Sequence, residues 1–120
     1  MMGRVDFSGR ALVPVLIRPT AGAPGHDVEA WIDTGFTGDL VLPQQQIEHL
    51  SLPQSGTVQA VLADGSQVVL STYSCVIDWF GTERHLEVVA NDGQFPLLGV
   101  GLLLGLDLQI SYRSRVVTIQ

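Results

Sequence analysis

The residues best suited to chemistry lie in one short turn, Asp33-Thr34-Gly35, between two apolar segments of the sequence. Gly35 has no side chain, so its N–H can approach the Asp33 carboxylate closely. Thr34 offers a hydroxyl that can donate and accept hydrogen bonds at once. Hydrogen-bond donors favour the ionised form of an acid, whereas burial and a neighbouring acid oppose it. This setting suits a carboxylate that acts as a catalyst.

Two apolar strands are expected to position this turn. Val28 to Ile32 predict a strand that ends at Asp33, and Asp39 to Leu42 predict a strand that leaves the turn. An earlier strand is expected from Arg10 to Arg18, where Pro14 favours an edge or a bulge.

The rest of the sequence predicts short strands separated by turns. Asp64-Gly65 lies between two apolar runs, which is a good signal for a hairpin. Turns or loops are expected at Thr20–Gly25, Pro53–Gly56, Gly81-Thr82 and Asn91–Gly93. Further strands are expected at Thr57–Leu62, Gln67–Phe80, Arg84–Ala90, Asp107–Tyr112 and Arg115–Ile119, and short helices at Gln44–Leu50 and, as one of two interpretations, Val100–Leu106. This pattern indicates one all-β domain over residues 1–120, closed or barrel-like, with one or two short helices.

Composition narrows the classes of function. The chain has 120 residues and a net charge of −6, and its six basic residues are all arginine, so we expect no nucleic-acid binding. Cys75, Trp31 and Trp79 are interpreted as core residues, and one unpaired thiol fits a reducing compartment. The first ten residues lack an apolar signal core, and the apolar run Pro96–Leu106 is too short to span a bilayer. We therefore expect a cytoplasmic protein that does not bind membranes.

The other polar residues favour structural interpretations. Asp39 is either a second acid or, as we favour, a surface residue of the turn. Asp33 and Asp39 lack the alternating oxygen ligands of a calcium loop. The three histidines, which are scattered without metal-ligand spacing, are His26, His49 and His85. We predict no metal and no cofactor, although Asp33-Thr34-Gly35 also has an ordinary interpretation as a turn.

The turn and its surroundings resemble those of aspartic proteases. Asp33-Thr34-Gly35 resembles the active-site triplet, with Leu40-Val41-Leu42-Pro43 after it. A hairpin with Ala63-Asp64-Gly65 at its tip follows where the family carries its flap. Leu97-Leu98-Gly99 resembles the family's apolar-apolar-glycine motif. From Leu12 to Ile119, the order and spacing are similar to the single-lobe, retropepsin-like branch, and the turn is closest to bacterial proteins of this type.

The resemblance implies a retropepsin-like closed β-barrel and an aspartic endopeptidase that acts as a homodimer on a peptide or protein. Asp33 of each subunit would act on a shared water, Thr34 would brace the two turns across the two-fold axis, and Gly35 would donate its N–H to the carboxylate. Phe36, which stands where viral and pepsin-like enzymes usually carry Ala or Ser, would line the substrate cleft. The residues of the hairpin tip that would close over the peptide are Ala63, Asp64 and Gly65. The strand near Val116–Ile119 would join the dimer interface.

Two other functions stay open at this point. Phe36, and a hairpin with Gly65 as its only glycine, favour a catalytically silent peptide-binding or dimerisation module on the same fold. The intact Asp33-Thr34-Gly35 favours the enzyme, because a pure binder has no need for two acids that repel each other. A small-molecule- or sugar-binding barrel would instead be a closed monomer.

Overall fold

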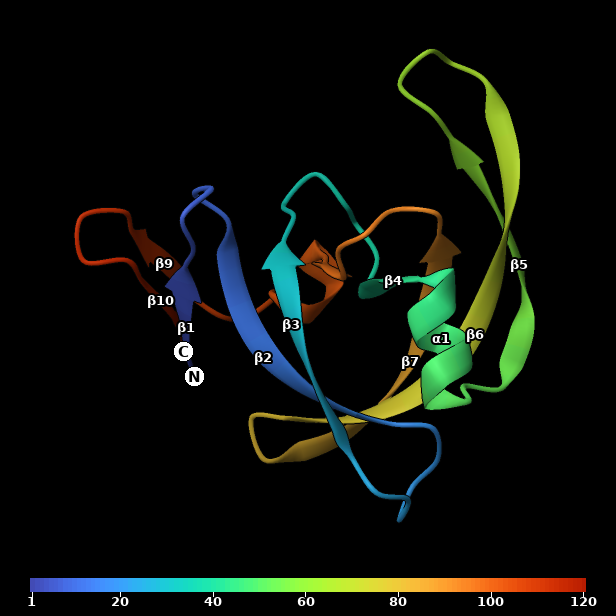
Figure 1. Ribbon diagram of the computed structural model, residues 1–120, viewed down its shortest axis with the longest axis horizontal. Helices are drawn as coiled ribbons and strands as arrows, with labels where there is room; N and C mark the ends of the chain where they lie inside the picture. The colour runs from blue at the N-terminus through green and yellow to red at the C-terminus, as the bar shows by residue number, and fades with distance from the viewer.

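The computed structural model describes residues 1–120, which form ten strands and two short helices (Figure 1). The strands are β1 (Met2–Val5), β2 (Ala11–Arg18), β3 (His26–Ile32), β4 (Leu40–Pro43), β5 (Gln54–Val61), β6 (Gln67–Trp79), β7 (Thr82–Asn91), β8 (Leu97–Leu98), β9 (Leu108–Ser111) and β10 (Val116–Ile119). The helices are α1 (Gln44–Leu50) and η1 (Val100–Leu102), a single 3-10 turn. The predicted all-β class is confirmed.

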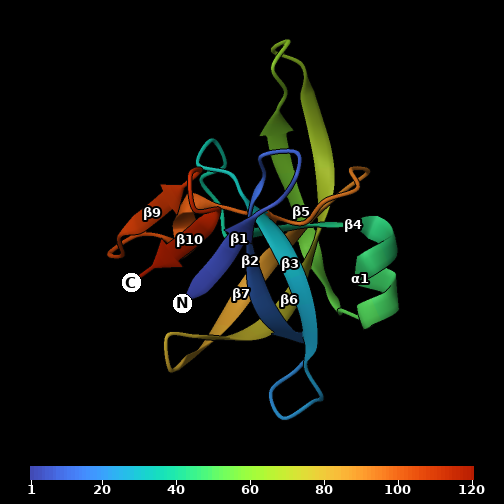
Figure 2. The same ribbon diagram turned by 60° about the vertical axis from the view of Figure 1, so that its left-hand side comes forward.

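All ten strands belong to one sheet, in the order β5-β6-β7-β4-β8-β3-β2-β1-β10-β9. An additional pairing joins β2 to β6, where Ile17 lies opposite Ile77. This pairing closes a circuit of strands that runs from β6 through β7, β4, β8, β3 and β2 back to β6. The hairpin of β5 and β6 extends beyond that circuit, and Figure 2 shows it rising away from the rest of the molecule.

Residue alternation along β3 decides which side chains enter the core. Val28, Ala30 and Ile32 are buried, and the residues between them face outward, as expected for a strand with one buried face. The prediction that Trp31 is a core residue is therefore wrong, because Trp31 falls in the outward register and is 39% exposed. Trp79 and Cys75 belong to the core of 23 buried residues, as predicted.

The hairpin connections follow local turn chemistry. Leu62 and Ser66 are joined by a backbone hydrogen bond, and Gly65 between them has φ +85°, which is typical of a three-residue hairpin loop. The next connection lies one residue earlier than predicted. It uses Phe80-Gly81 with φ of 52° and 76°, and Thr82 already pairs with Trp79.

Several boundaries differ from expectation. The predicted loop at Pro53–Gly56 is wrong after its first residue, because β5 begins at Gln54 and pairs with Tyr73 of β6. The helical interpretation of Val100–Leu106 holds only for the 3-10 turn of η1. The helix at Gln44–Leu50 is confirmed, and Ile47 and Leu50 face the core. Pro14 lies on β2 where the pairings to β1 have ended, so the missing N–H costs no hydrogen bond there.

Strand β1 was not predicted, and it changes the surroundings of the C-terminus. β1 pairs with β10 on one side and with β2 on the other, and β10 also pairs with β9 along its whole length. Both edges of β10 are therefore occupied within the chain, and β9 forms the open edge of this end of the sheet. The two termini lie side by side at this end (Figure 1). Neither helix has the length and apolar character of a membrane-spanning segment.

Candidate active site

Strand β3 delivers Asp33 to the end of the sheet, and β8 fixes it there. Trp31 and Ile32 pair in parallel with Leu97 and Leu98, and the Asp33 N–H donates to the Leu98 carbonyl at 2.9 Å. Asp33 is half-buried. Its position along the strand is therefore set by main-chain hydrogen bonds to the predicted Leu97-Leu98-Gly99 segment.

The turn itself orients the Asp33 carboxylate. The Gly35 N–H donates to Asp33 Oδ1 at 2.9 Å, as the sequence predicted, and the Phe36 N–H donates to the Asp33 carbonyl at 3.2 Å. A side chain at Gly35 would crowd Oδ1. One carboxylate oxygen is thus held by the backbone, and Oδ2 has no hydrogen-bond partner within the chain. The exposed Thr34 lies beside Asp33.

The far side of the turn is braced by the start of η1. Three successive N–H groups donate to turn carbonyls: Gly99 to Asp39, Val100 to Phe36, and Gly101 to Gly38, at 2.8 to 3.0 Å. We call this set of three hydrogen bonds the brace. The side chain of Phe36 fits into this brace, because any Cβ at Gly38 or Gly99 would collide with its ring. The ring therefore packs against two glycines of the fold. Sequence reasoning missed this role of Gly38 and Gly99, for which the only signal was their lack of a side chain.

A cavity of about 660 Å³ adjoins the turn. It lies between the turn from Gly35 to Asp39, the outer face of β4 and β7, and the hairpin of β5 and β6. From the hairpin, the cavity is lined by Val58, Gln59, Ala60, Val61 and Leu70. Phe36 also lines it, and the interpretation of this cavity as the substrate cleft stays a prediction.

The tip residues of the hairpin do not line this cavity. Ala63, Asp64 and Gly65 are exposed, and the arms of the hairpin rather than its tip face the turn. Asp64 Oδ1 accepts hydrogen bonds from the Ser66 hydroxyl at 2.6 Å and the Ser66 N–H at 2.9 Å, and these bonds hold the pKa of Asp64 below its usual value. Contact between the tip and a peptide stays a prediction.

Asp39, interpreted from the sequence as a surface residue, is half-buried and lines the cavity. Burial, together with the charge of Asp39, raises the pKa of the Cys75 thiol to about 12. That thiol is neutral at physiological pH and is not a nucleophile. No group of three or more His, Cys, Asp or Glu side chains is placed to hold a metal ion.

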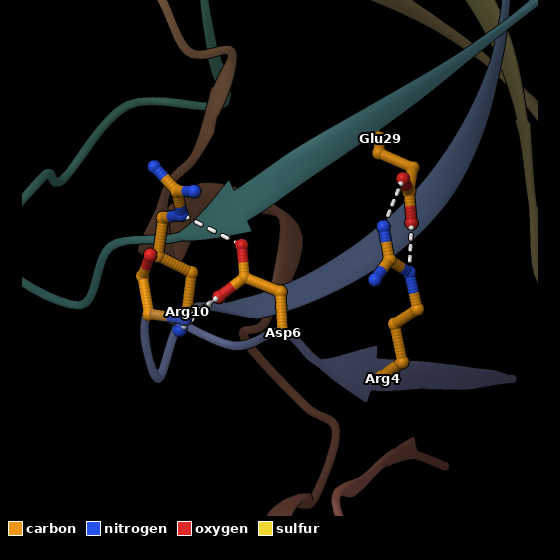
Figure 3. A network of polar contacts seen from close by, with 5 residues as sticks. Arg4, Asp6, Arg10 and Glu29 are labelled. Carbon is orange, nitrogen blue, oxygen red and sulfur yellow. Dashed lines mark hydrogen bonds and ion pairs between the residues drawn. The ribbon is translucent and has the colours of Figure 1, made fainter.

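A second set of polar contacts supports β3 on its outward face (Figure 3). Arg4 of β1 pairs with Glu29 of β3 through two hydrogen bonds of 2.8 and 2.9 Å. Arg10 pairs with Asp6 at 2.8 Å, and its guanidinium lies 3.9 Å from the centre of the Phe95 ring and 5.7 Å from that of Trp31. The exposed Trp31 is thus covered in part by Arg10 next to the end of β3.

No protein-family model and no curated protein matches the sequence. Solved structures match the fold. A retropepsin-like aspartic protease from Rickettsia conorii matches with a TM-score of 0.67 and 15% identity, over 99% of this chain and 88% of that one. The chain has the retropepsin-like fold. EIAV protease in complex with the inhibitor HBY-793 matches with a TM-score of 0.56 and 20% identity, over 82% of this chain and 88% of that one.

These similarities confirm the fold that the motifs predicted. Within the retropepsin-like fold, the chain carries Asp33-Thr34-Gly35 at the end of β3, and Leu97-Leu98-Gly99 connects β8 to the brace. Only one Asp-Thr-Gly triplet occurs in the sequence. A single chain therefore supplies one carboxylate of this kind.

Proposed function

We propose that the protein is an aspartic endopeptidase that acts as a homodimer and hydrolyses peptide bonds with a water activated by two Asp33 carboxylates. One observation carries this proposal. In a retropepsin-like fold, Asp33 is held at a strand end with Oδ1 on the Gly35 N–H and Oδ2 without a partner, next to a large cavity. A two-fold axis beside the turn brings the two copies of Asp33 together, because such an interface is self-complementary.

The proposed chemistry follows from the contact between two acids. Two carboxylates in contact repel each other, so the pair shares one proton at moderate pH. The ionised member takes a proton from the bound water, and the protonated member donates a hydrogen bond to the peptide carbonyl. The pair titrates as a unit, so neither subunit is assigned the acid or the base. Thr34 braces the two turns across the axis.

The proposed substrate is a peptide in extended form. The cavity offers an apolar wall on the hairpin side, where Val58 and Val61 are 36% and 70% exposed. Exposed apolar side chains on a hairpin are typical of a surface that a ligand covers. The arms line the bound peptide, and the tip at Ala63, Asp64 and Gly65 closes over it and excludes water. We also propose a cytoplasmic location, because a single unpaired thiol fits a reducing compartment.

The proposed interface lies at the end of the sheet that carries the termini. Since both edges of β10 are paired within the chain, main-chain pairing between subunits would use the open edge of β9. The apolar side chains nearby include Tyr112, in the loop after β9, which is 65% exposed.

The Asp33→Asn variant tests this function. The amide keeps an oxygen for the Gly35 N–H, so we expect an unchanged fold and dimer, with peptide cleavage reduced at least about 10³-fold because the shared proton is lost. Cleavage of a mixed peptide library is followed by mass spectrometry, and the oligomer by sedimentation. Asp27→Asn, which removes an exposed carboxylate near the start of β3, away from the turn and from β9, is the matched control. Wild-type activity in Asp33→Asn contradicts the mechanism, and an inactive wild-type dimer favours the silent module.

A further inference from the structure

The floor of the cavity beside the turn carries two acidic side chains. Asp39 directly precedes β4, and Glu87 lies in β7. These strands are parallel, with Leu40 opposite Val88, so Asp39 and Glu87 occupy neighbouring positions one residue earlier. Both line the cavity. The carboxylate of Asp39 is held against η1, because a Cβ at Gly101 would collide with its Oδ1.

Neither acid is neutralised within the chain. Asp39 and Glu87 take part in none of the ion pairs and in none of the side-chain hydrogen bonds of the structure. The cavity has no basic residue in its lining. Two negative charges therefore share a partly enclosed space without a cation.

The remaining walls are largely apolar. Val41 and Val89 continue the floor beyond the two acids, Leu70 and Val58 face them from the hairpin, and Phe36 closes the side next to the turn. An apolar wall that leads to negative charge matches a side chain with an aliphatic stem and a cationic end. Lysine and arginine have this form.

Resting on the proposed peptidase function, we propose that this cavity binds a Lys or Arg side chain of the substrate, close to the bond that is cut. The stem packs between the hairpin and β4, and the cation forms charge-assisted hydrogen bonds with Asp39 and Glu87. A glutamate there would add a third negative charge. Because Gly35 and Phe36 belong to the same cavity, its occupant lies next to the catalytic turn, and a two-fold dimer has one such cavity for each subunit.

Decapeptide libraries with one position fixed as Lys, norleucine or Glu test this preference, since norleucine resembles lysine without its charge. We expect wild-type protein to cut bonds flanked by Lys or Arg about tenfold faster than those flanked by norleucine, and to reject Glu. The advantage shrinks as salt is raised, because the pair is partly exposed. Asp39→Asn combined with Glu87→Gln removes the advantage. Glu83→Gln, which neutralises an exposed acid of β7 outside the cavity, keeps it.

The outcomes separate the two proposals. Cleavage without any preference for a cation overturns the cavity assignment and leaves the peptidase intact. If wild-type protein cuts nothing, the peptidase proposal fails, and a peptide-binding experiment then tests whether the cavity takes a cationic side chain. In that case the libraries are mixed with Asp33→Asn protein, and retained peptides are identified after gel filtration. Enrichment of Lys and Arg, lost in the combined variant, supports the assignment, and equal retention of norleucine overturns it.

Discussion

The turn at Asp33 and the tip of the β5–β6 hairpin are both short loops, but they are held in different ways. At one end of the turn the Asp33 N–H donates to the Leu98 carbonyl, and at the other end turn carbonyls accept hydrogen bonds from Gly99 and the start of η1, so distant parts of the chain fix both ends. The tip, from Leu62 to Ser66, is held by hydrogen bonds among its own residues. β5 pairs only with β6, and its other edge is open.

This difference suits two tasks. A carboxylate that acts on water must keep its position, and main-chain bonds to β8 and η1 provide that without relying on side chains. In the proposed peptidase, a cover that admits a peptide must move relative to the sheet. The outer part of the hairpin, from Thr57 to Ser71, can do so without breaking bonds to other strands, because β6 pairs with β7 and β2 only from Thr72 onward. The contrast leads to predictions in which changes near the turn have larger effects than changes in the hairpin.

The largest expected effect comes from Gly99→Ala. Gly99 has an extended backbone that any residue adopts, so the cost is steric: the new Cβ would collide with the Gly38 carbonyl and the Phe36 ring. We expect a loss of about 3 kcal/mol in the free energy of unfolding, measured with urea. Gly56→Ala in β5 is the matched control, since its Cβ would lie 3.7 Å from Thr72 Oγ1, and should change stability by less than about 0.5 kcal/mol. If both variants lost the same free energy of unfolding, the turn would be no more tightly packed than the hairpin.

A smaller loss is expected from Trp79→Phe. The buried indole N–H of Trp79 donates to the carbonyl of Leu102, the last residue of η1, at 2.9 Å. Phenylalanine leaves that carbonyl without its partner and fills less of the core, which should cost about 2 kcal/mol. Tyr73→Phe in β6 removes a longer, part-buried hydrogen bond of 3.2 Å from Gln44 and should cost about 0.5 kcal/mol in the same urea titration. A larger loss for Tyr73→Phe would contradict the importance of η1.

Local chemistry was predictable from the sequence. The bond from Gly35 to Asp33 spans two residues, and the hairpin at Asp64-Gly65 follows from turn preferences. The helix at Gln44–Leu50 follows from Pro43 and from the spacing of Ile47 and Leu50. In each case the residues that decide the structure are neighbours in the chain.

Features that depend on distant partners were not predictable in the same way. β1 exists because β2 and β10 pair with it, and its own residues give only a weak strand pattern. The brace joins Phe36 to Val100, and the pairing of β4 with β7 brings Asp39 beside Glu87. The sequence places these residues far apart, and only the folded sheet brings them together.

The smallest expected effect concerns the pKa of Asp64 at the hairpin tip. The Ser66 hydroxyl, and then the Ser66 N–H, stabilise the ionised carboxylate and lower its pKa from 3.8 in the folded state. Because the pKa of Asp64 is lower in the folded state than in the unfolded state, the ionised carboxylate stabilises the fold. This stabilisation is fully present above the unfolded pKa and is lost as the pH falls through the folded pKa.

An NMR titration of the Asp64 side chain should therefore have its midpoint below 3.8, and Ser66→Ala should move the midpoint upward while the N–H bond remains. Because the tip makes its bonds internally, Ser66→Ala should lower the urea midpoint of the whole chain at neutral pH only by the small amount that the lost pKa shift represents. If Ser66→Ala did not move the midpoint of the NMR titration, the hydrogen bond from the Ser66 hydroxyl to Asp64 would be absent from the tip. A large fall in the urea midpoint would show that the tip is tied to the fold as firmly as the turn is.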